Sequence, residues 1–280
     1  MYSLSLMAVG DTLRVLCIGN SFSIDAVEQE LLPLAEAEKV PIRIGNLYIP
    51  GCSLKQHATN AMQAAMAYSF RELYGKTRIV TDSVSLQYAL QQDRWDIITM
   101  QQASHDSGLW ETYEPWLQIL IDTIRSYCPK ARLAWHETWA YSEDATHPGF
   151  ANYHHSQKQM FRSIGQCTDS VMANYPFETL ISTGKAIQLA RKGRLGDTLC
   201  RDGFHLRFEY GRYLAACVWL EALTGIKPGQ HHELILTWYA YPDQNGVYQS
   251  VKNRDIRTSH TERLCRKAAH KAVKKVKSKE

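Results

Sequence analysis

The feature that most constrains the fold is an apolar stretch near the N-terminus that ends in glycine and passes into a helical pattern. Residues 13–19 are largely apolar, as in a buried strand. Gly19-Asn20-Ser21 follows, and apolar residues recur at helical spacing through residues 24–38. This order predicts that the Ser21 hydroxyl lies at the mouth of a strand-to-helix turn, where unpaired helix N–H groups stabilise developing negative charge.

A second group of reactive residues lies far downstream. Asp202 and His205 stand three residues apart on a glycine-containing loop that precedes another helical stretch. A histidine can act as general base for a serine nucleophile, and a neighbouring carboxylate can orient it. Each feature also has an ordinary explanation, because Gly, Asn and Ser favour turns and a histidine can be a satisfied core residue. Together, the three residues Ser21, Asp202 and His205 predict a serine hydrolase.

Three short blocks resemble the SGNH/GDSL hydrolase superfamily. Gly19-Asn20-Ser21-Phe22-Ser23 resembles its opening block, Asp202-x-x-His205 its closing block, and Gly51 stands where its oxyanion-hole glycine is expected. The Gly-Asn-Ser-Phe-Ser and Asp-Gly-x-His motifs are most similar to a bacterial branch frequent in Bacteroides-type organisms. The resemblance covers residues 13–225. It implies that Ser21 is the nucleophile, His205 the base and Asp202 the orienting carboxylate, with the Ser21 and Gly51 N–H groups in the oxyanion hole.

The third block departs from the superfamily pattern. Residues 95–100 indicate a buried strand, after which the superfamily usually continues Gly-x-Asn-Asp, with the asparagine donating to the oxyanion. This chain continues Gln101-Gln102-Ala103-Ser104-His105, which aligns His105 with that asparagine. A glutamine side chain, the Ser104 hydroxyl or the His105 N–H could each be the third donor, since all present a suitable hydrogen, and we favour Gln102 or His105. The alternative is that this polar loop only satisfies backbone groups at the end of a strand.

An aromatic stretch, Trp135 to Tyr141, begins at the end of the strand predicted at residues 131–136. Aromatic faces beside hydrogen-bonding groups suit sugar rings, so we expect a carbohydrate ester as substrate. The alternative is that Trp135 and Trp139 only pack in the core, as tryptophans often do. The residues expected to contact substrate are Asn20, Gln101, Ser104, His136, Trp139 and Tyr141.

Strands alternate with helices along the chain, which predicts right-handed crossovers and a parallel sheet. We expect an α/β fold, a three-layer α/β/α sandwich around a mainly parallel, five-stranded, flavodoxin-like sheet. Ser21, Gly51 and residues 101–105 then follow the carboxyl ends of strands, where α/β proteins bind ligands. The predicted strands are 13–19, a short one ending at Ile49, 95–101, 131–136 and 177–181; the predicted helices lie near 24–38, 54–69, 112–128, 151–173 and 184–192, with an insert around 70–82 and a short helix ending at Gln92.

The chain has 280 residues, of which 45% are hydrophobic, and is long enough for one large domain. We expect an N-terminal segment at 1–12, a hydrolase-like domain at 13–258 and a basic helix at 259–280. The first ten residues are apolar and end in small residues. They fit a signal-peptide remnant, and so a periplasmic or secreted protein, and they fit a docked or frayed N-terminus equally well. The sequence contains no apolar stretch of about 20 residues, so no membrane span is expected.

Seven cysteines, an odd number without Cys-x-x-Cys spacing, argue against a disulfide framework. The adjacent pairs His154-His155 and His231-His232 face apart on a helix or strand, and no His-Glu-x-x-His motif accompanies them. Glycine-rich loops for dinucleotides or phosphates do not occur either. We therefore expect neither a metal nor a cofactor, and no pattern indicates an oligomeric state.

The C-terminal segment 259–280 holds eight Lys/Arg and two Glu, so its net charge is +6 in a chain of net charge +4. Leu264, Ala268, Ala272 and Val276 form an apolar stripe at helical spacing, which predicts an amphipathic helix. Such a helix can bind nucleic acid or an anionic membrane surface. Because no aromatic or glycine-rich RNA-binding pattern accompanies the charge, we prefer a docked, solvated helix and expect no nucleic-acid partner.

These features predict a metal-independent serine esterase that removes an acyl group, in the simplest case acetyl, from a small-molecule or glycan ester. Three alternatives stay open. They are a lipolytic or thioester acyl hydrolase, a catalytically weakened carbohydrate-binding protein of the same fold, and anion or nucleic-acid binding through the basic helix.

Overall fold

The fold is built on one seven-stranded sheet. The computed structural model describes residues 12–231, 238–242, 248–252 and 258–277. The strand order is β4-β3-β2-β1-β5-β6-β7; β2, β1, β5, β6 and β7 are parallel, and β3 and β4 form an antiparallel hairpin at one edge. The strands are β1 (Leu13–Gly19), β2 (Ile42–Tyr48), β3 (Tyr68–Tyr74), β4 (Thr77–Val84), β5 (Ile97–Met100), β6 (Arg132–His136) and β7 (Thr179–Ile181).

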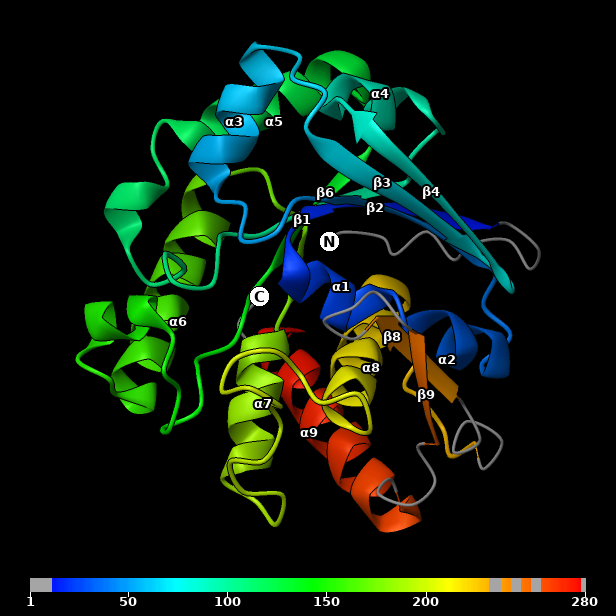
Figure 1. Ribbon diagram of the computed structural model, residues 1–280, viewed down its shortest axis with the longest axis vertical. Coiled ribbons are helices and arrows are strands. Elements are labelled where there is room, and N and C mark those ends of the chain that lie inside the picture. The colour runs from blue at the N-terminus through cyan, green and yellow to red at the C-terminus, as the bar shows by residue number, and fades with distance from the viewer. Residues whose placement is uncertain (1–11, 232–237, 243–247, 253–257, 278–280) are drawn as a thin grey trace.

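Helices cover both faces of this sheet (Figure 1). Helices α3, α4 and α5 lie on one face, and α1, α2, α7, α8 and α9 lie on the other, which confirms the expected three-layer α/β/α sandwich. The helices are α1 (Ser21–Val27), α2 (Leu31–Ala37), α3 (Leu54–Met62), α4 (Leu86–Gln91), α5 (Trp116–Tyr127), α6 (Gln157–Asn174), α7 (Thr183–Arg191), α8 (Gly211–Thr224) and α9 (Ser259–Lys277), with short 3-10 helices η1 (Trp110–Thr112) and η2 (Pro148–Tyr153).

The central strand β1 is buried on both faces, as expected for a parallel strand covered by helices on each side. Val15 and Cys17 point into the core shared with α1 and α8. Leu16 and Ile18 point into the core shared with α3 and α5. This packing fixes the end of β1, and therefore the position of the turn that carries Ser21.

The sheet has a hairpin that the sequence analysis did not predict. The helix expected at 54–69 ends at Met62, because residues from Tyr68 onward form β3 and pair with β2. The insert expected around 70–82 is the β3–β4 hairpin. Strand β4 is exposed along most of its length, so it lacks the alternation of apolar and polar residues that predicts a half-buried strand.

The helix expected at 24–38 is in fact two helices. Helix α1 ends at Val27, and α2 begins at Leu31 with Pro33 in its first turn. Proline has no N–H, and its ring clashes with the carbonyl four residues earlier. It therefore fits the first turn of α2 but interrupts one continuous helix.

The C-terminal helix α9 is docked on the body of the protein. It packs against α7 and α8, and its residues Cys265, Ala269, Ala272 and Val273 are buried. Ala268 and Ala272 of the predicted stripe are among the buried residues, Leu264 is half-buried, and the side chain of Val276 lies outside the described part. Residues 1–11, with the predicted signal-peptide remnant, also lie outside it.

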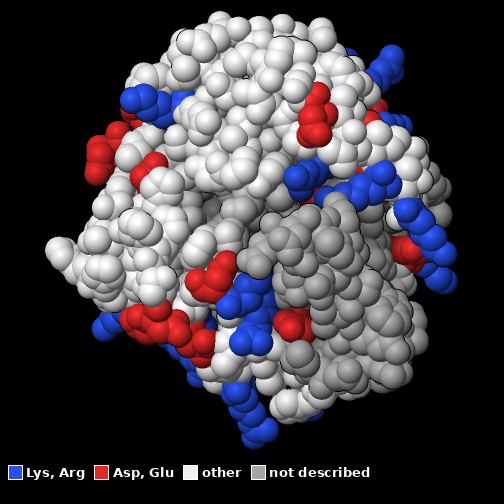
Figure 2. Space-filling model, viewed as in Figure 1, with Lys and Arg blue, Asp and Glu red and all other residues white. Residues whose placement is uncertain are grey.

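A separate antiparallel pair, β8 (Trp238–Pro242) and β9 (Tyr248–Lys252), precedes α9 in the chain. No helix in the described ranges has the length and apolar composition needed to cross a lipid bilayer. On the face shown in Figure 2, Lys and Arg side chains lie among Asp and Glu side chains, so the described surface there has mixed charge.

Candidate active site

The loops at the carboxyl ends of the parallel strands gather the sequence blocks that contain Ser21, Gly51 and residues 101–105 at one edge of the sheet. Because β1 lies between β2 and β5, the turn that carries Ser21 is flanked by the turn after β2, with Gly51, and by the loop after β5, with residues 101–105. The chain leaves β1 toward β2 on one side and returns to β5 on the other. Open α/β sheets bind their ligands at this kind of switch point.

Asp202 and His205 form a well-aligned pair. Asp202 Oδ2 lies 2.7 Å from His205 Nδ1, and Asp202 Oδ1 accepts hydrogen bonds from the backbone N–H groups of His205 (2.7 Å) and Phe204 (3.2 Å). Burial alone would raise the pKa of Asp202, but the hydrogen bonds and charge of His205, with the Phe204 N–H, lower it to about 2. The carboxylate therefore stays ionised and holds the proton of the imidazole on Nδ1.

The turn between these two residues requires glycine. Gly203 has φ of +88°, a left-handed conformation, and a Cβ there would lie 2.8 Å from Cα of Ala145. Its carbonyl also accepts a 2.7 Å hydrogen bond from the Ser142 N–H. The loop that follows β6 thus supports the Asp202–His205 turn from one side.

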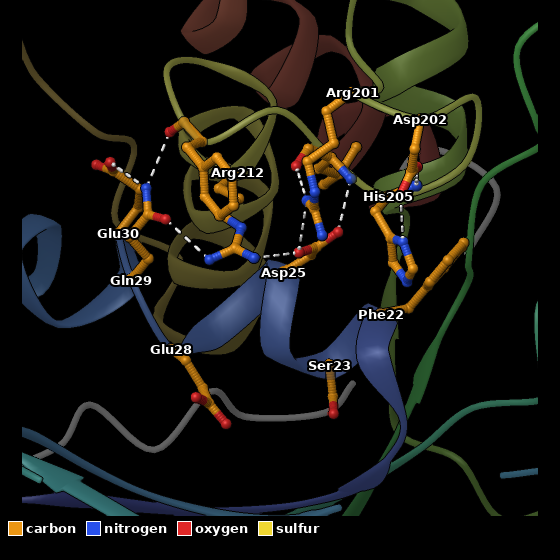
Figure 3. Close-up of polar contacts among 12 residues, drawn as sticks. Phe22, Ser23, Asp25, Glu28, Gln29, Glu30, Arg201, Asp202, His205 and Arg212 are labelled. Carbon is orange, nitrogen blue, oxygen red and sulfur yellow. Dashed lines mark hydrogen bonds and ion pairs between the residues drawn. The ribbon is translucent and has the colours of Figure 1, made fainter. Parts of the chain in front are cut away.

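His205 reaches from this loop toward the N-terminal end of α1, where Ser21 is located (Figure 3). Its ring packs edge-on against that of Phe22, with 6.0 Å between centroids. Ser21 is partly exposed, and neither its Oγ nor His205 Nε2 has a hydrogen-bond partner within the described part of the chain. In enzymes without bound substrate the bond from nucleophile to base is often long, and it tightens when substrate binds.

The backbone N–H groups of Ser21 and Gly51 have no hydrogen-bond partner among the described residues. Asn20 caps α1 through its side chain, which accepts from the Phe22 N–H at 3.0 Å and leaves the Ser21 N–H without a partner among the described residues. Gly51 is exposed, has φ of +62°, and likewise donates to no residue in the described ranges. This left-handed conformation favours glycine.

The two candidates for the third oxyanion donor have different surroundings. Gln102 is buried; its amide nitrogen donates to the Thr112 carbonyl (3.2 Å) and hydroxyl (3.0 Å), and its oxygen accepts from the backbone of Leu54 and Ala103. Both of its N–H groups are therefore occupied. His105 is 35% exposed, and its Nε2 lies 3.6 Å from Asp106 Oδ2.

Three of the expected substrate contacts form a buried polar chain behind the site. Asn20 Oδ1 accepts from the Gln101 amide at 2.8 Å, and Gln101 Oε1 lies 2.8 Å from His136 Nδ1. His136 Nε2 is 3.0 Å from the Thr183 hydroxyl, and burial lowers the pKa of His136 to about 3. Because all three are at most 2% exposed, a role in direct substrate contact does not fit them; they hold the strand ends together.

The aromatic residues after β6 are also buried. Trp139 stacks on Phe22 with a centroid distance of 3.9 Å and donates to the Phe204 carbonyl at 2.7 Å. Tyr141 is fully buried, and its hydroxyl lies 2.8 Å from that of Ser104. The expectation that Trp139 and Tyr141 offer their faces to a sugar is therefore replaced by a packing role, whereas Ser104 remains partly exposed.

Two further residues lie near the site, and the sequence alone assigned neither of them a role. Asp25, on α1, binds Arg201 and Leu206, which flank the Asp202–His205 turn, and also Arg212 on α8. His147 lies beside Phe204 and His105, at the start of η2. A carboxylate one helical turn after Ser21 was a usable signal for Asp25, but nothing in the local pattern distinguishes His147 from other histidines.

The described residues contain no group of three His, Cys, Asp or Glu side chains placed to hold a metal ion. All seven cysteines are free thiols, and six of them are buried. They pack as small apolar residues.

The sheet order defines an α/β protein whose fold matches that of SGNH-like hydrolases of known structure. The family model of DUF4886, a domain of unknown function, matches residues 14–233, and the chain belongs to this family. A DUF4886 protein from Bacteroides uniformis, solved by crystallography, is 37% identical over 94% of this chain and 95% of its own, with a TM-score of 0.82.

Two more distant solved structures are also similar to this chain. A mutant of Axe2, an acetyl-xylooligosaccharide esterase from a Geobacillus species, is 12% identical over 78% of this chain and 97% of its own, with a TM-score of 0.50. A candidate GDSL-like lipase from Parabacteroides merdae is 16% identical over 76% of this chain and 95% of its own, with a TM-score of 0.49. Comparison with curated proteins gives no match.

Proposed function

We propose that this protein is an SGNH-type serine esterase that removes an acyl group from a carbohydrate ester. The observation that carries the proposal is the Asp202–His205 pair. Its 2.7 Å contact fixes the tautomer of the imidazole and leaves Nε2 unpaired, on the side of the helix that begins at Ser21. The fold neighbour that acts on acetylated xylo-oligosaccharides supports the carbohydrate class, since it gives one such substrate that this fold accommodates.

In the proposed mechanism Ser21 Oγ attacks the ester carbonyl carbon while His205 Nε2 accepts the hydroxyl proton. The negative charge moves to the carbonyl oxygen, where the free N–H groups of Ser21 and Gly51 donate to it. The bond from carbon to the alcohol oxygen then breaks, and His205 gives its proton to the leaving alcohol. Water attacks the acylated Ser21 with His205 again as base, which releases the carboxylic acid and restores the serine.

His105 is the better third donor to the oxyanion. The amide N–H groups of Gln102 already bind Thr112, so their use would break two buried hydrogen bonds. His105 is partly exposed on the loop after β5, and its ring can turn from Asp106 toward the carbonyl oxygen without such a loss.

The experiment is an assay of purified protein for release of p-nitrophenol from p-nitrophenyl acetate and of acetate from acetylated xylan. We expect turnover of both, with a loss of at least about 1000-fold in Ser21→Ala. A serine-directed fluorophosphonate should label Ser21. Equal turnover in the wild type and Ser21→Ala would contradict the proposal, and hydrolysis of long acyl esters or thioesters alone would favour an acyl hydrolase of that kind.

A further inference from the structure

His147 occupies a defined position at the edge of the site. It caps the 3-10 helix η2, where its Nδ1 accepts a 3.0 Å hydrogen bond from the Gly149 backbone N–H. The Tyr141 hydroxyl lies 3.3 Å from the same nitrogen. The ring is half-buried between its neighbours.

These contacts determine which nitrogen of His147 carries the proton. A backbone N–H can only donate, so Nδ1 must present its lone pair, and the proton of the neutral ring is on Nε2. Burial lowers the pKa of His147, and electrostatic repulsion between this ring and those of His105 and His205 lowers it further, against the opposing charge of Asp202. The ring is thus a neutral donor with a fixed direction.

The Nε2–H of His147 has no hydrogen-bond partner within the part of the chain that the structure describes. The ring stands 5.0 Å from Phe204, nearly perpendicular to it, and Phe204 in turn lies 4.2 Å from His205. His147 also stacks on His105, with 5.8 Å between ring centroids. The Phe204 ring therefore contacts both His147, which carries the free donor, and His205, the proposed base.

We infer that His147 is a specificity-determining residue whose Nε2–H donates to an oxygen of the alcohol part of the ester. The inference rests on the proposed esterase function. In that mechanism the carbonyl oxygen faces Ser21, Gly51 and His105, whereas His205 protonates the departing alcohol. His147 lies between Phe204, which contacts His205, and His105. Because His105 already serves the carbonyl oxygen in the proposed mechanism, the His147 donor is assigned to the alcohol, where it selects substrates with a second oxygen near the scissile ester, as polyhydroxy alcohols have.

The test compares two esters of equal size, 2-hydroxyethyl acetate and n-propyl acetate, which differ in one hydroxyl group. We expect the kcat/KM of the wild type to be about tenfold higher for the hydroxylated ester, a ratio that corresponds to the free energy of one neutral hydrogen bond. In His147→Phe, which keeps an aromatic ring without the donor, this ratio should fall to about one. His147→Gln, whose amide can donate from nearly the same place, should restore part of it.

Two controls separate recognition from folding. In His147→Asn the side-chain oxygen can still accept from the Gly149 N–H, so the cap of η2 is kept. Because the asparagine side chain is shorter, its N–H groups no longer reach the position of the His147 Nε2–H. This variant should therefore lose the preference for the hydroxylated ester, as His147→Phe does. His260→Phe, exposed on the distant helix α9, should leave the ratio unchanged. The 15N chemical shifts of the His147 ring report the tautomer independently of activity.

An unchanged ratio in His147→Phe, or a proton on Nδ1, overturns the inference even if the protein is an active esterase. Hydrolysis of neither ester by the wild type, together with no fluorophosphonate labelling of Ser21, contradicts the esterase function itself. The two failures are therefore distinguishable.

Discussion

The carboxylate of Asp25 accepts a 2.6 Å hydrogen bond from the backbone N–H of Leu206. Asp25 lies on α1, one helical turn after Ser21, and Leu206 directly follows His205. Arg212, at 2.6 Å, and Arg201, at 3.3 Å, complete the shell of donors around this carboxylate (Figure 3). One buried side chain thus ties the helix of the proposed nucleophile to the loop of the proposed base.

We expect Asp25→Asn to reduce kcat by about 10- to 100-fold with little change in KM, because small errors in the alignment of reacting groups are costly. The neutral amide cannot pair with both guanidinium groups, and the loop that carries His205 loses its anchor. Steady-state kinetics on p-nitrophenyl acetate measure the effect. A kcat within twofold of the wild type would show that the loop is positioned without Asp25.

Glu28 provides the matched control for this variant. It is also a buried carboxylate near α1, but it pairs with Arg71 and Arg78 of the β3–β4 hairpin and points away from His205 (Figure 3). Glu28→Gln and Asp25→Asn should both lower the free energy of unfolding, by about 3 kcal/mol each. Only Asp25→Asn should reduce kcat strongly.

Asp202→Asn should lower kcat by about 100- to 10000-fold while the fold remains intact. The asparagine amide would donate to Nδ1 and so favour the wrong tautomer of His205. Because the pKa of Asp202 is about 2, its carboxylate is ionised in the wild type at any pH above that value. The acid limb of the kcat/KM profile above pH 4 should therefore not reflect Asp202, and Asp202→Asn should lower activity across the whole range.

His105→Ala should lower kcat by about 100-fold with KM little changed, as expected for a donor that acts mainly in the transition state. Gln102→Ala should instead lower the melting temperature, because Gln102 binds Thr112, Leu54 and Ala103 in the interior. Thermal unfolding and kinetics of both variants decide the assignment. Full kcat in His105→Ala would leave an oxyanion hole of two backbone N–H groups.

Two buried histidines should make the protein sensitive to acid. Burial lowers the pKa values of His57 and His136 from 6.5 to about 3. Between pH 3 and pH 6.5 each of these histidines binds a proton in the unfolded chain but not in the native state. The free energy of unfolding therefore falls as the pH falls from 6.5 toward 3. Each histidine contributes up to about 1.4 kcal/mol per pH unit. In urea titrations at pH 6.5 and pH 5, His57→Gln should show a smaller loss of stability than the wild type; an equal loss would argue against a neutral, buried His57.

Removal of residues 259–280 should destabilise the protein by about 5 kcal/mol and lower the melting temperature by about 10 °C. The deletion uncovers the core that Cys265, Ala269 and Val273 help to fill, and it removes the 2.6 Å contact of His270 with Glu221 on α8. Calorimetry measures the change. A truncated protein with unchanged stability would show that α9 contributes little to the core.

Charge reversal on α9 tests whether this helix binds nucleic acid, and it leaves the helix in place. Arg263, Lys267 and Lys271 are exposed on α9. Their joint change to glutamate should leave ester hydrolysis and stability nearly unchanged, because exposed charges far from the site are screened by salt. Salt-dependent binding of nucleic acid by the wild type, abolished in this variant, would instead favour the nucleic-acid-binding alternative.

The sequence alone was sufficient for the α/β class and for the grouping of the blocks at one sheet edge. The apolar run of β1 and the turn residues that follow it are local signals, since burial on both faces and a strand-to-helix turn each restrict the residues allowed. The Asp202–His205 contact was equally accessible, because its two partners lie on one short turn. Each of these features depends only on a few residues that are neighbours in the sequence, so it can be predicted without the tertiary structure.

Only the tertiary structure decided which polar and aromatic residues lie behind the site and which lie on it. The type of a residue does not reveal how deeply its side chain is buried. Trp139 and Tyr141 were therefore expected to face a substrate at the surface, whereas both are fully buried. The bond from Asp25 to Leu206 spans 181 residues, and His147 meets Phe204 only because the loops after β6 and before α8 come together. Periodicity records the local conformation of a segment, whereas such contacts depend on how distant segments pack.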